Sequence, residues 1–370
     1  MAGIYFHIPF CKRACAYCDF FKEIGTRRLA PLVAAMHREL ENRRDYLGGE
    51  AVRTRYFGGG TPSLCPPETI RGALRRTEEL FDCTAVEETT LEANPDDLDE
   101  AYLSALREAG VDRLSIGIQS FDDDCLRLMN RRHTAAQAEE AVRAARRCGF
   151  ANITVDLIFG VPGFGGDSLR RSLDRTLALD VQHVSAYHLT VEPDTAFGRR
   201  AARGDFRPVD EEVSEREFLA VHDALCEAGY EHYEVSNYAR PGFRARHNAS
   251  YWHGEKYLGI GPGAHSYDGS GRCWNVASVE EYIGGAPAQG ERLTDRDRRN
   301  EYVMTRLRTA EGIDLGEFGK RFGPDRLGRL LRAAESPIQA SRAVVDGQRL
   351  KIPPERFLVS DQVIETLFEA

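Results

Sequence analysis

A repeated alternation of strand-like and helical stretches is the feature that most constrains this fold. Short apolar runs, each followed by sequence of helical character, occupy residues 4–8, 52–57, 89–93, 113–118, 153–159 and 183–189. Asp99 and Thr134 are placed as N-caps of two of the intervening helices. Consecutive β-α units of this length predict an α/β fold in which helices cover a parallel sheet. A doubly wound sheet and a full or partial (β/α) barrel both satisfy the pattern.

Polar side chains near the ends of three of these runs favour the barrel. In "RLSIGIQS" the leucine and isoleucines share one face of a strand, and Gln119 lies on the other. The same alternation places Glu92 and Asp156 opposite the apolar faces of their own strands. Capping of loops, or pairing with arginines, would also account for them. In a barrel, however, the three would converge in the mouth where ligands bind, and we therefore expect a partial (β/α)6 TIM-type barrel.

The alternation stops after about residue 230, which divides the chain into three predicted parts. Residues 1–230 form the barrel. Residues 231–292 are rich in Gly, Tyr and His with frequent turn residues, and we expect irregular strands and loops that close the barrel's open side. Residues 293–370 are helical again, with a hairpin at Asp346 and Gly347 and a last helix, and are predicted to form a small, mostly helical C-terminal domain.

Composition restricts the class of protein. The longest apolar runs are strand-sized, which predicts no transmembrane segment, and no basic region precedes the first run as in a signal peptide. We therefore expect a cytoplasmic location with reduced cysteines, and peripheral membrane contact stays open. The net charge of −9 argues against a nucleic-acid partner. The arginine-rich stretch 292–308 is interleaved with acidic residues and is predicted to be a solvated helix face.

Three of the nine cysteines have ligand spacing. Cys11, Cys15 and Cys18 follow the first strand as C-x3-C-x2-C. Such a soft thiolate site suits zinc or an iron–sulfur cluster. Structural zinc sites usually take four protein ligands, and no second pair of cysteines or histidines follows with suitable spacing. A [4Fe–4S] cluster is favoured, and three cysteines would leave one of its irons open.

A glycine-rich turn, "YFGGGTPS", follows the second strand. Glycines allow backbone groups to approach a ligand closely, such as the ammonium and carboxylate of an amino acid. A tight β-α turn needs glycine in any case, so the turn alone is weak support for a binding site.

Together with "LEANP", "RLSIGIQSF", "VDLIFGVPG" and "HLTVEP", these motifs resemble the radical S-adenosylmethionine (SAM) superfamily. Within it, nearly the whole chain is similar to the oxygen-independent coproporphyrinogen oxidase group. The resemblance implies a [4Fe–4S] cluster whose open iron is chelated by the amino and carboxylate groups of SAM. The SAM contacts that it implies are Tyr5, Tyr17, Gly59, Gly60, Thr61, Glu92, Gln119, Arg131 and Asp156.

Two features decide between the branches of that group. Phe20 stands where the coproporphyrinogen dehydrogenases carry a further cysteine, and "RHNASYWHG" looks like the haem-associated motif of the haem chaperone branch HemW. Ala16, where that branch often has proline, is a departure of little weight. The resemblance implies a protein that binds haem and transfers it to acceptor haemoproteins, with respiratory proteins as candidates. The alternatives are a coproporphyrinogen III dehydrogenase and, more distantly, a radical SAM methyltransferase.

The residues of this motif allow two interpretations. An imidazole beside aromatic rings can ligate haem iron while the rings stack on the macrocycle. A hydrogen-bonded histidine in an aromatic mini-core accounts equally well for the same residues. The resemblance favours the first, with His247 as the axial ligand and His253 and His265 as alternatives. The residues expected at the haem are His247, Asn248, Tyr251 and Trp252.

Overall fold

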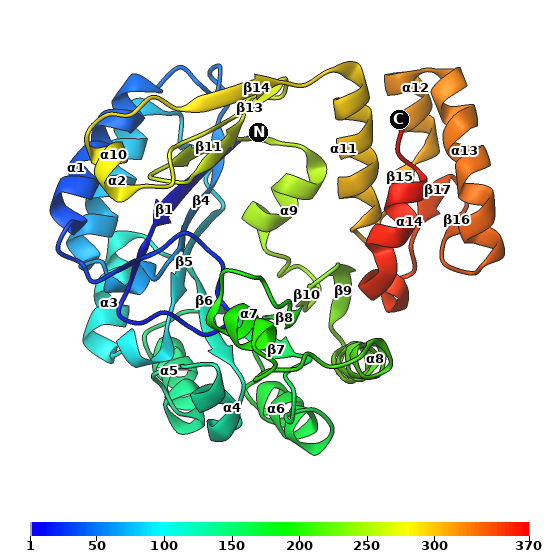
Figure 1. The fold of residues 1–370 in the computed structure, drawn as a ribbon. Helices are drawn as coiled ribbons and strands as arrows, with labels where there is room; N and C mark the ends of the chain where they lie inside the picture. The colour runs from blue at the N-terminus through cyan, green and yellow to red at the C-terminus, as the bar shows by residue number, and fades with distance from the viewer. Residues whose placement is uncertain (1, 370) are drawn as a thin grey trace.

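The fold is built around a curved sheet of twelve strands (Figure 1), in a computed structural model that describes residues 2–369. Six parallel strands lie side by side in chain order. They are β1 (Ala2–Ile8), β4 (Val52–Gly59), β5 (Glu88–Ala93), β6 (Arg113–Gln119), β7 (Asn152–Phe159) and β8 (His183–His188). A doubly wound sheet would reverse its strand order at a switch point. The unbroken order confirms the barrel-type prediction.

Helices cover the outer face of the parallel strands, as predicted (Figure 1). They are α1 (Leu29–Asn42), α2 (Pro67–Leu80), α3 (Glu100–Ala109), α4 (Asp123–Leu128), α5 (Ala135–Arg147), α6 (Asp167–Ala178) and α8 (Glu211–Glu227). Asp99 caps α3 by accepting the Tyr102 N–H, and Thr134 begins α5 with a capping box. Both predicted N-caps are confirmed. Short elements complete this part: β2 (Phe10–Cys11), β3 (Glu23–Ile24), the 3₁₀ turns Pro62–Leu64 and Pro95–Asp97, and α7 (Ala196–Ala202).

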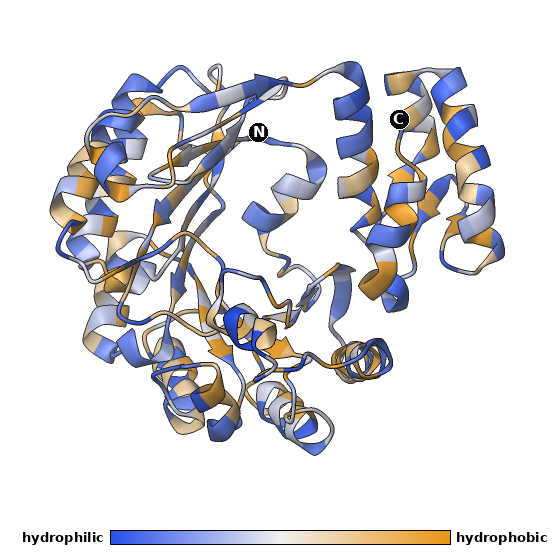
Figure 2. Cartoon of the chain, viewed as in Figure 1, coloured by the Kyte–Doolittle hydropathy of each residue, from blue (hydrophilic) through white to orange (hydrophobic). Residues whose placement is uncertain are grey.

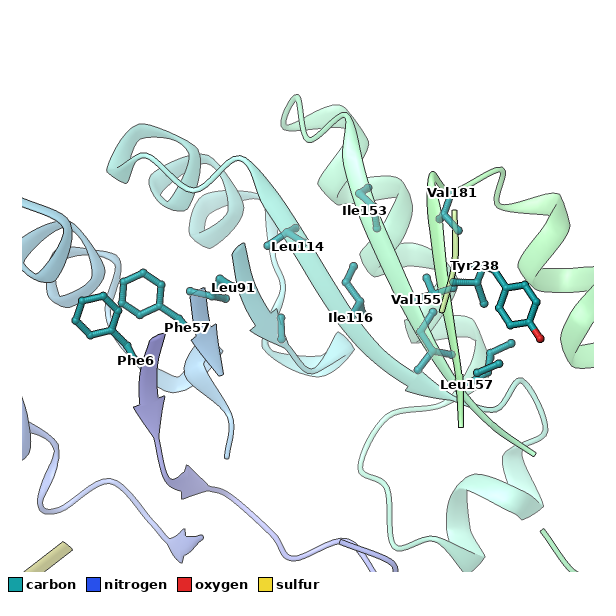
Figure 3. Close-up of a cluster of buried hydrophobic side chains, with 14 of the residues drawn as sticks. Phe6, Phe57, Leu91, Leu114, Ile116, Ile153, Val155, Leu157, Val181 and Tyr238 are labelled. Atoms are coloured by element: carbon teal, nitrogen blue, oxygen red, sulfur yellow. The ribbon is translucent and has the colours of Figure 1, made fainter. Parts of the chain in front are cut away.

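The main hydrophobic core fills the layer between sheet and helices. Leu91, Leu114 and Ile116 point from their strands into this layer, and the rings of Phe6 and Phe57 stack 4.6 Å apart between centroids (Figure 3). The surrounding helices alternate apolar and polar residues around their circumference (Figure 2). Because these apolar side chains take the outer face, the polar residues of the same strands face the interior of the curved sheet.

Residues 231–292 extend the sheet at both edges. At one edge, β10 (Asn237–Ala239) and β9 (Glu231–Glu234) continue antiparallel from β8. At the other, β11 (Lys256–Ile260) pairs parallel with β1 and leads to β12 (His265–Tyr267), β13 (Gly271–Trp274) and β14 (Gln289–Arg292). Helix α9 (Arg246–His253) crosses the interior of the curve between β1, β4 and α11, and α10 (Val279–Ile283) packs on α1. This part is thus more regular than the expected loops.

The C-terminal residues form helices around a small sheet. The helices are α11 (Asp295–Leu307), α12 (Leu315–Phe322), α13 (Pro324–Gln339) and α14 (Ser360–Thr366), with a 3₁₀ turn at Pro354–Val359. The sheet pairs β17 (Arg349–Lys351) with β15 (Ile313–Asp314) and β16 (Val344–Asp346), which confirms the predicted hairpin. No helix within residues 2–369 has the length and hydropathy needed to span a bilayer.

The prediction of a solvated arginine-rich face on α11 is wrong for Arg299. Its side chain is only 2% exposed and donates to the carbonyl oxygen of Leu367 at the end of α14. Its guanidinium also lies 5.7 Å from the centre of the Phe318 ring. Arg299 therefore ties three C-terminal helices together, a role that the neighbouring acidic residues in the sequence do not reveal.

One buried carboxylate anchors α9 inside the sheet. The Glu88 side chain, on β5, accepts the backbone N–H groups of Arg246 and His247, each at 3.1 Å. It is 2% exposed, and its Oε2 lies 3.8 Å from Nε of the buried Arg113. Glu88 thus satisfies two N–H groups that a helix end leaves unpaired and also offsets a buried positive charge.

Replacing Glu88 with alanine should therefore destabilise the whole protein. The change leaves the end of α9 without its acceptor and the Arg113 guanidinium without its counter-charge, and loss of one partner of a buried pair typically costs about 3–5 kcal/mol. Urea unfolding followed by circular dichroism would measure the loss. Glu87→Ala is the matched control, because its pairs with Arg53 and Arg246 lie at the surface and contribute little. Equal effects of the two changes would contradict the anchoring role.

Candidate functional site

A cavity of about 440 Å³ lies at the carboxyl ends of the parallel strands. The three thiols of Cys11, Cys15 and Cys18 line it together with the three polar residues placed there by strand alternation. Of the predicted cluster and SAM residues, it brings together Cys11, Cys15, Cys18, Tyr17, Gly59, Gly60, Thr61, Glu92, Gln119, Arg131 and Asp156. We call this space the cysteine cavity.

Two side chains from outside the cysteine loop hold it in place. The Thr61 hydroxyl donates to Sγ of Cys11 at 3.4 Å, and Arg131 donates to Sγ of Cys15 at 3.3 Å. Burial raises the pKa of the Cys11 and Cys18 thiols, so a positively charged metal centre would be needed to hold them as thiolates. No three His, Cys, Asp or Glu side chains within residues 2–369 are gathered as for a single metal ion. Thiolates arranged around a cavity instead suit an iron–sulfur cluster.

Arg131 is half-buried behind this loop. Besides Cys15 it donates to Oδ1 of Asn94 at 2.6 Å and to the carbonyl oxygen of Gly117 at 2.5 Å. Its Nε has no hydrogen-bond partner in the described part of the chain. A buried donor left free in a cavity wall is uncommon and fits a site that receives an acceptor from a ligand.

Two half-buried carboxylates face the same cavity. Glu92 accepts the Tyr56 hydroxyl at 2.7 Å and the Gly59 N–H at 3.1 Å, and Asp156 accepts the Ser115 hydroxyl at 3.2 Å. Burial raises the pKa of Glu92 to about 7 and that of Asp156 to about 6. Carboxylates with such shifted pKa values in a cavity are typical of functional sites. They offer acceptors for hydroxyl or ammonium groups of a ligand.

The glycine-rich turn is required first by packing within the protein. Gly59 has a positive φ of 107°, and a Cβ there would lie 2.5 Å from the His7 ring. A Cβ on Gly60 would lie 2.6 Å from the backbone carbon of Pro9. The glycines therefore allow β4 to lie against the strand that enters the cysteine loop, and this packing brings Thr61 next to Cys11.

Gln119 reaches the cavity, as predicted, from an irregular end of strand β6 that the sequence pattern does not reveal. The β6–β7 register shifts between Gly117 and Gln119, and Gln119 adopts a φ of 71°. Left-handed backbone is costly for a residue other than glycine and is concentrated at functional sites. A Cβ on Gly117 would lie 2.8 Å from Nε2 of Gln119, so this glycine makes room for the amide.

A second cavity of about 550 Å³ lies between α9, the β1–β11–β12 edge of the sheet and helices α11 and α12. We call it the aromatic cavity. Its aromatic and histidine lining comprises Tyr5, His7, Phe20, Phe21, Tyr251, Trp252, His253, Tyr257, His265, Tyr267 and Tyr302. Phe20 lines both cavities and is 68% exposed. Tyr5, expected at SAM, lies in this second cavity and hydrogen-bonds His7 at 3.0 Å.

The haem-associated motif is divided by the packing of α9. Tyr251 and Trp252 line the aromatic cavity, whereas His247 and Asn248 line neither cavity. His247 is 1% exposed, with Nδ1 hydrogen-bonded to Thr54 and Nε2 to Tyr251, each at 2.8 Å. Burial lowers its pKa to about 3. Because both ring nitrogens are occupied, the geometry does not favour the expected axial ligand and matches the mini-core interpretation of His247.

Three other histidines line the aromatic cavity. His7 contacts Tyr5 and the carbonyl oxygen of Phe21, and His253 lies 3.7 Å from Glu311. His265 forms no side-chain hydrogen bond or ion pair with any residue between 2 and 369, and its ring stacks on Trp274 at 5.9 Å. His265 is therefore the cavity histidine whose two ring nitrogens are both available. His7 was missed in the sequence, although "YFHIPFC" places it beside the cysteine loop.

Known proteins share much of this sequence. The pattern of the radical SAM superfamily matches residues 5–176. The haem chaperone HemW of Mycobacterium tuberculosis is 36% identical over 376 residues, covering 99% of this chain and 94% of that protein. HemW of Lactococcus lactis is also 36% identical, covering 86% and 84%.

The structural likeness is equally extensive. The structure of coproporphyrinogen III oxidase (HemN) from Escherichia coli superposes with a TM-score of 0.85, over 99% of this chain and 90% of that one, at 22% identity. At that identity the likeness establishes the fold, and the HemW relatives establish the family. The chain belongs to the radical SAM superfamily and, within it, to the HemW family.

Proposed function

We propose that the protein is a haem chaperone that binds haem in the aromatic cavity and passes it to acceptor haemoproteins. The observation that carries the proposal is a free imidazole, His265, in a cavity of about 550 Å³ lined with aromatic rings. Such a space offers one nitrogen ligand to the iron and apolar faces to the macrocycle. The curated relatives of similar length are named as haem chaperones, which supports the same function.

The cysteine cavity would hold the other two cofactors of the proposal, the iron–sulfur cluster and SAM. Cys11, Cys15 and Cys18 would ligate a [4Fe–4S] cluster, which supplies an open iron for the amino-acid end of SAM. Arg131 keeps a positive charge beside Cys15, while Glu92 and Asp156 offer acceptors to the polar groups of SAM. Phe20 separates this site from the aromatic cavity and lines both.

The position of His265 suits a protein that releases its haem. It lies on β12, in the edge extension of the sheet, and is itself exposed. A single histidine would leave the other face of the iron available to a ligand from the acceptor. The proposed transfer therefore needs no rearrangement of the barrel.

The cysteine site predicts a four-iron cluster. Anaerobic reconstitution should give about four irons and four sulfides per chain, and Cys15→Ala should lose most of both because one thiolate is missing. Iron and sulfide analysis measures the result. Cys148→Ser is the matched control, since that thiol lies outside both cavities. Stoichiometric zinc without sulfide in the unaltered protein would contradict the assignment.

Asp156 should contribute directly to SAM affinity. Loss of a buried hydrogen-bond acceptor typically costs about 1–3 kcal/mol, so Asp156→Ala should weaken SAM binding roughly 5- to 150-fold in calorimetry. Since the pKa of Asp156 is about 6, acidification from roughly pH 7.5 to 5 should protonate it and weaken binding by the unaltered protein. Asp174→Ala, at an exposed position on α6, is the control. Unchanged affinity in Asp156→Ala would place the SAM site elsewhere.

The two candidate haem ligands predict opposite results. His265→Ala should weaken haem binding and shift the Soret band, because the iron loses its nitrogen ligand. His247→Ala should lower the midpoint of unfolding, since it removes hydrogen bonds to Thr54 and Tyr251, but should retain the Soret band. Absorbance titration of purified protein with haemin measures both. The reverse pattern in folded variants would restore His247 as the ligand.

An activity measurement separates the proposal from its enzymatic alternative. Anaerobic incubation with coproporphyrinogen III should give no protoporphyrinogen, because Phe20 replaces the further cysteine of the dehydrogenases. Robust conversion by the reconstituted protein would overturn the chaperone proposal.

A further inference from the structure

The two walls of the aromatic cavity differ in charge. The sheet side is formed mainly by aromatic rings and histidines, with Arg272 on β13, while the C-terminal helices bring the other three arginines. In all, four arginines and two glutamates line the cavity: Arg272, Arg298, Arg306, Arg321, Glu255 and Glu301. An occupant that pairs with this lining therefore needs an apolar body and an acidic edge.

Two of the arginines are already neutralised. Arg272 donates to Glu301 at 3.0 Å, and Arg298 donates to Asp295 at 2.5 Å. Arg306 and Arg321 form no ion pair or side-chain hydrogen bond with the described part of the chain. Their guanidinium carbons instead lie 5.4 and 5.3 Å from the centre of one ring, that of Tyr302. Two unpaired cations thus flank the same aromatic side chain in the cavity wall.

Tyr302 supplies a third unpaired donor. Its side chain lines the aromatic cavity, the residue is only 6% exposed, and its hydroxyl has no hydrogen-bond partner within residues 2–369. Buried polar groups in folded proteins are nearly always hydrogen-bonded. An unpartnered hydroxyl on a ring that two unpaired guanidinium groups approach therefore points to an anionic ligand that the protein itself does not provide.

We propose that Arg306, Arg321 and Tyr302 bind the two propionate carboxylates of haem. This inference rests on the proposed function, since it assigns the ligand's acidic edge within the same cavity. The planar guanidinium group matches a carboxylate with two parallel hydrogen bonds, which a point charge cannot do. The cavity's remaining free carboxylate, Glu255, follows α9 and repels propionates from that end.

These three residues, which we call the clamp, also set the orientation of the macrocycle. With its propionates against α11 and α12, the ring lies along the aromatic side chains of the sheet, where His265 is available to the iron. Two guanidinium groups suit two carboxylates on one edge of the ring. Coproporphyrinogen carries four, around the whole ring, so the clamp favours the dicarboxylate product of haem synthesis.

The first test needs no altered protein. Haemin and haemin dimethyl ester share iron, ring and axial chemistry but differ in charge at the propionates. Soret titration of the reconstituted full-length protein should give roughly 100-fold weaker binding of the ester, about tenfold for each propionate that can no longer pair with a guanidinium group. Equal affinity for the two compounds would overturn the clamp.

The second test uses a double variant. Arg306→Gln with Arg321→Gln should weaken haemin roughly 100-fold and leave the ester unchanged. Arg296→Gln is the matched control, because Arg296 lies exposed on the same helix outside the cavity. The pair Arg306→Lys and Arg321→Lys keeps both charges but not the paired hydrogen bonds, so it should restore only part of the affinity for haemin that the glutamine pair loses. Cluster content and the midpoint of thermal unfolding confirm that each variant is folded.

The outcomes separate this inference from the function on which it rests. If the unaltered protein binds neither haemin nor its ester, the proposed function fails and the clamp with it. If it binds haemin but the glutamine double variant binds haemin equally well, the clamp is refuted while haem binding stands. A weaker affinity for haemin alone, partly restored by the lysine pair, supports both.

Discussion

Helix α9 occupies the interior of the curved sheet because the buried Glu88 carboxylate accepts its first N–H groups. From that fixed end, one face of α9 packs His247 against Tyr56, with ring centres 5.0 Å apart. The opposite end of the helix presents Tyr251 and Trp252 to the aromatic cavity. The lining of the aromatic cavity therefore depends on the position of α9. If α9 lost its anchor, this cavity would lose part of its lining.

A continuous set of interactions joins the cavities through this helix. Glu92, in the cysteine cavity, accepts the Tyr56 hydroxyl at 2.7 Å, and the Tyr56 ring stacks on His247. His247 in turn hydrogen-bonds Tyr251, which lines the aromatic cavity, at 2.8 Å. Tyr56 and His247, in the middle of this set, are both buried, whereas Glu92 and Tyr251 at its two ends face the cavities. His247 thus contacts both Tyr56 and Tyr251, while its two ring nitrogens are hydrogen-bonded to Thr54 and Tyr251.

The sequence predicted the barrel and the cysteine cavity well because both depend on local periodicity. Alternation within single strands placed Glu92 and Asp156 in the mouth, and the structure has them there. The sequence could not reveal the buried, hydrogen-bonded state of His247, because that burial depends on a helix anchored by Glu88, 159 residues away in sequence. Nor could it find the aromatic cavity, because this cavity depends on the pairing of β11 with β1, which brings His265 on β12 to the same edge of the sheet as the first strand. The prediction of a solvated side chain was wrong for Arg299 for the same reason, because its partner lies at the end of another helix.

Phe20 shows how one side chain serves both cavities. It is 68% exposed while lining both spaces. Full burial of a phenylalanine side chain stabilises by about 1.5–3 kcal/mol, so a flat apolar ligand that covers Phe20 gains part of that free energy. A cysteine here would offer the macrocycle a smaller surface and would add a reactive sulfur next to the cluster loop. An aromatic ring at this position therefore supports the proposed haem binding, as do the free imidazole and the unpaired arginines of the same cavity.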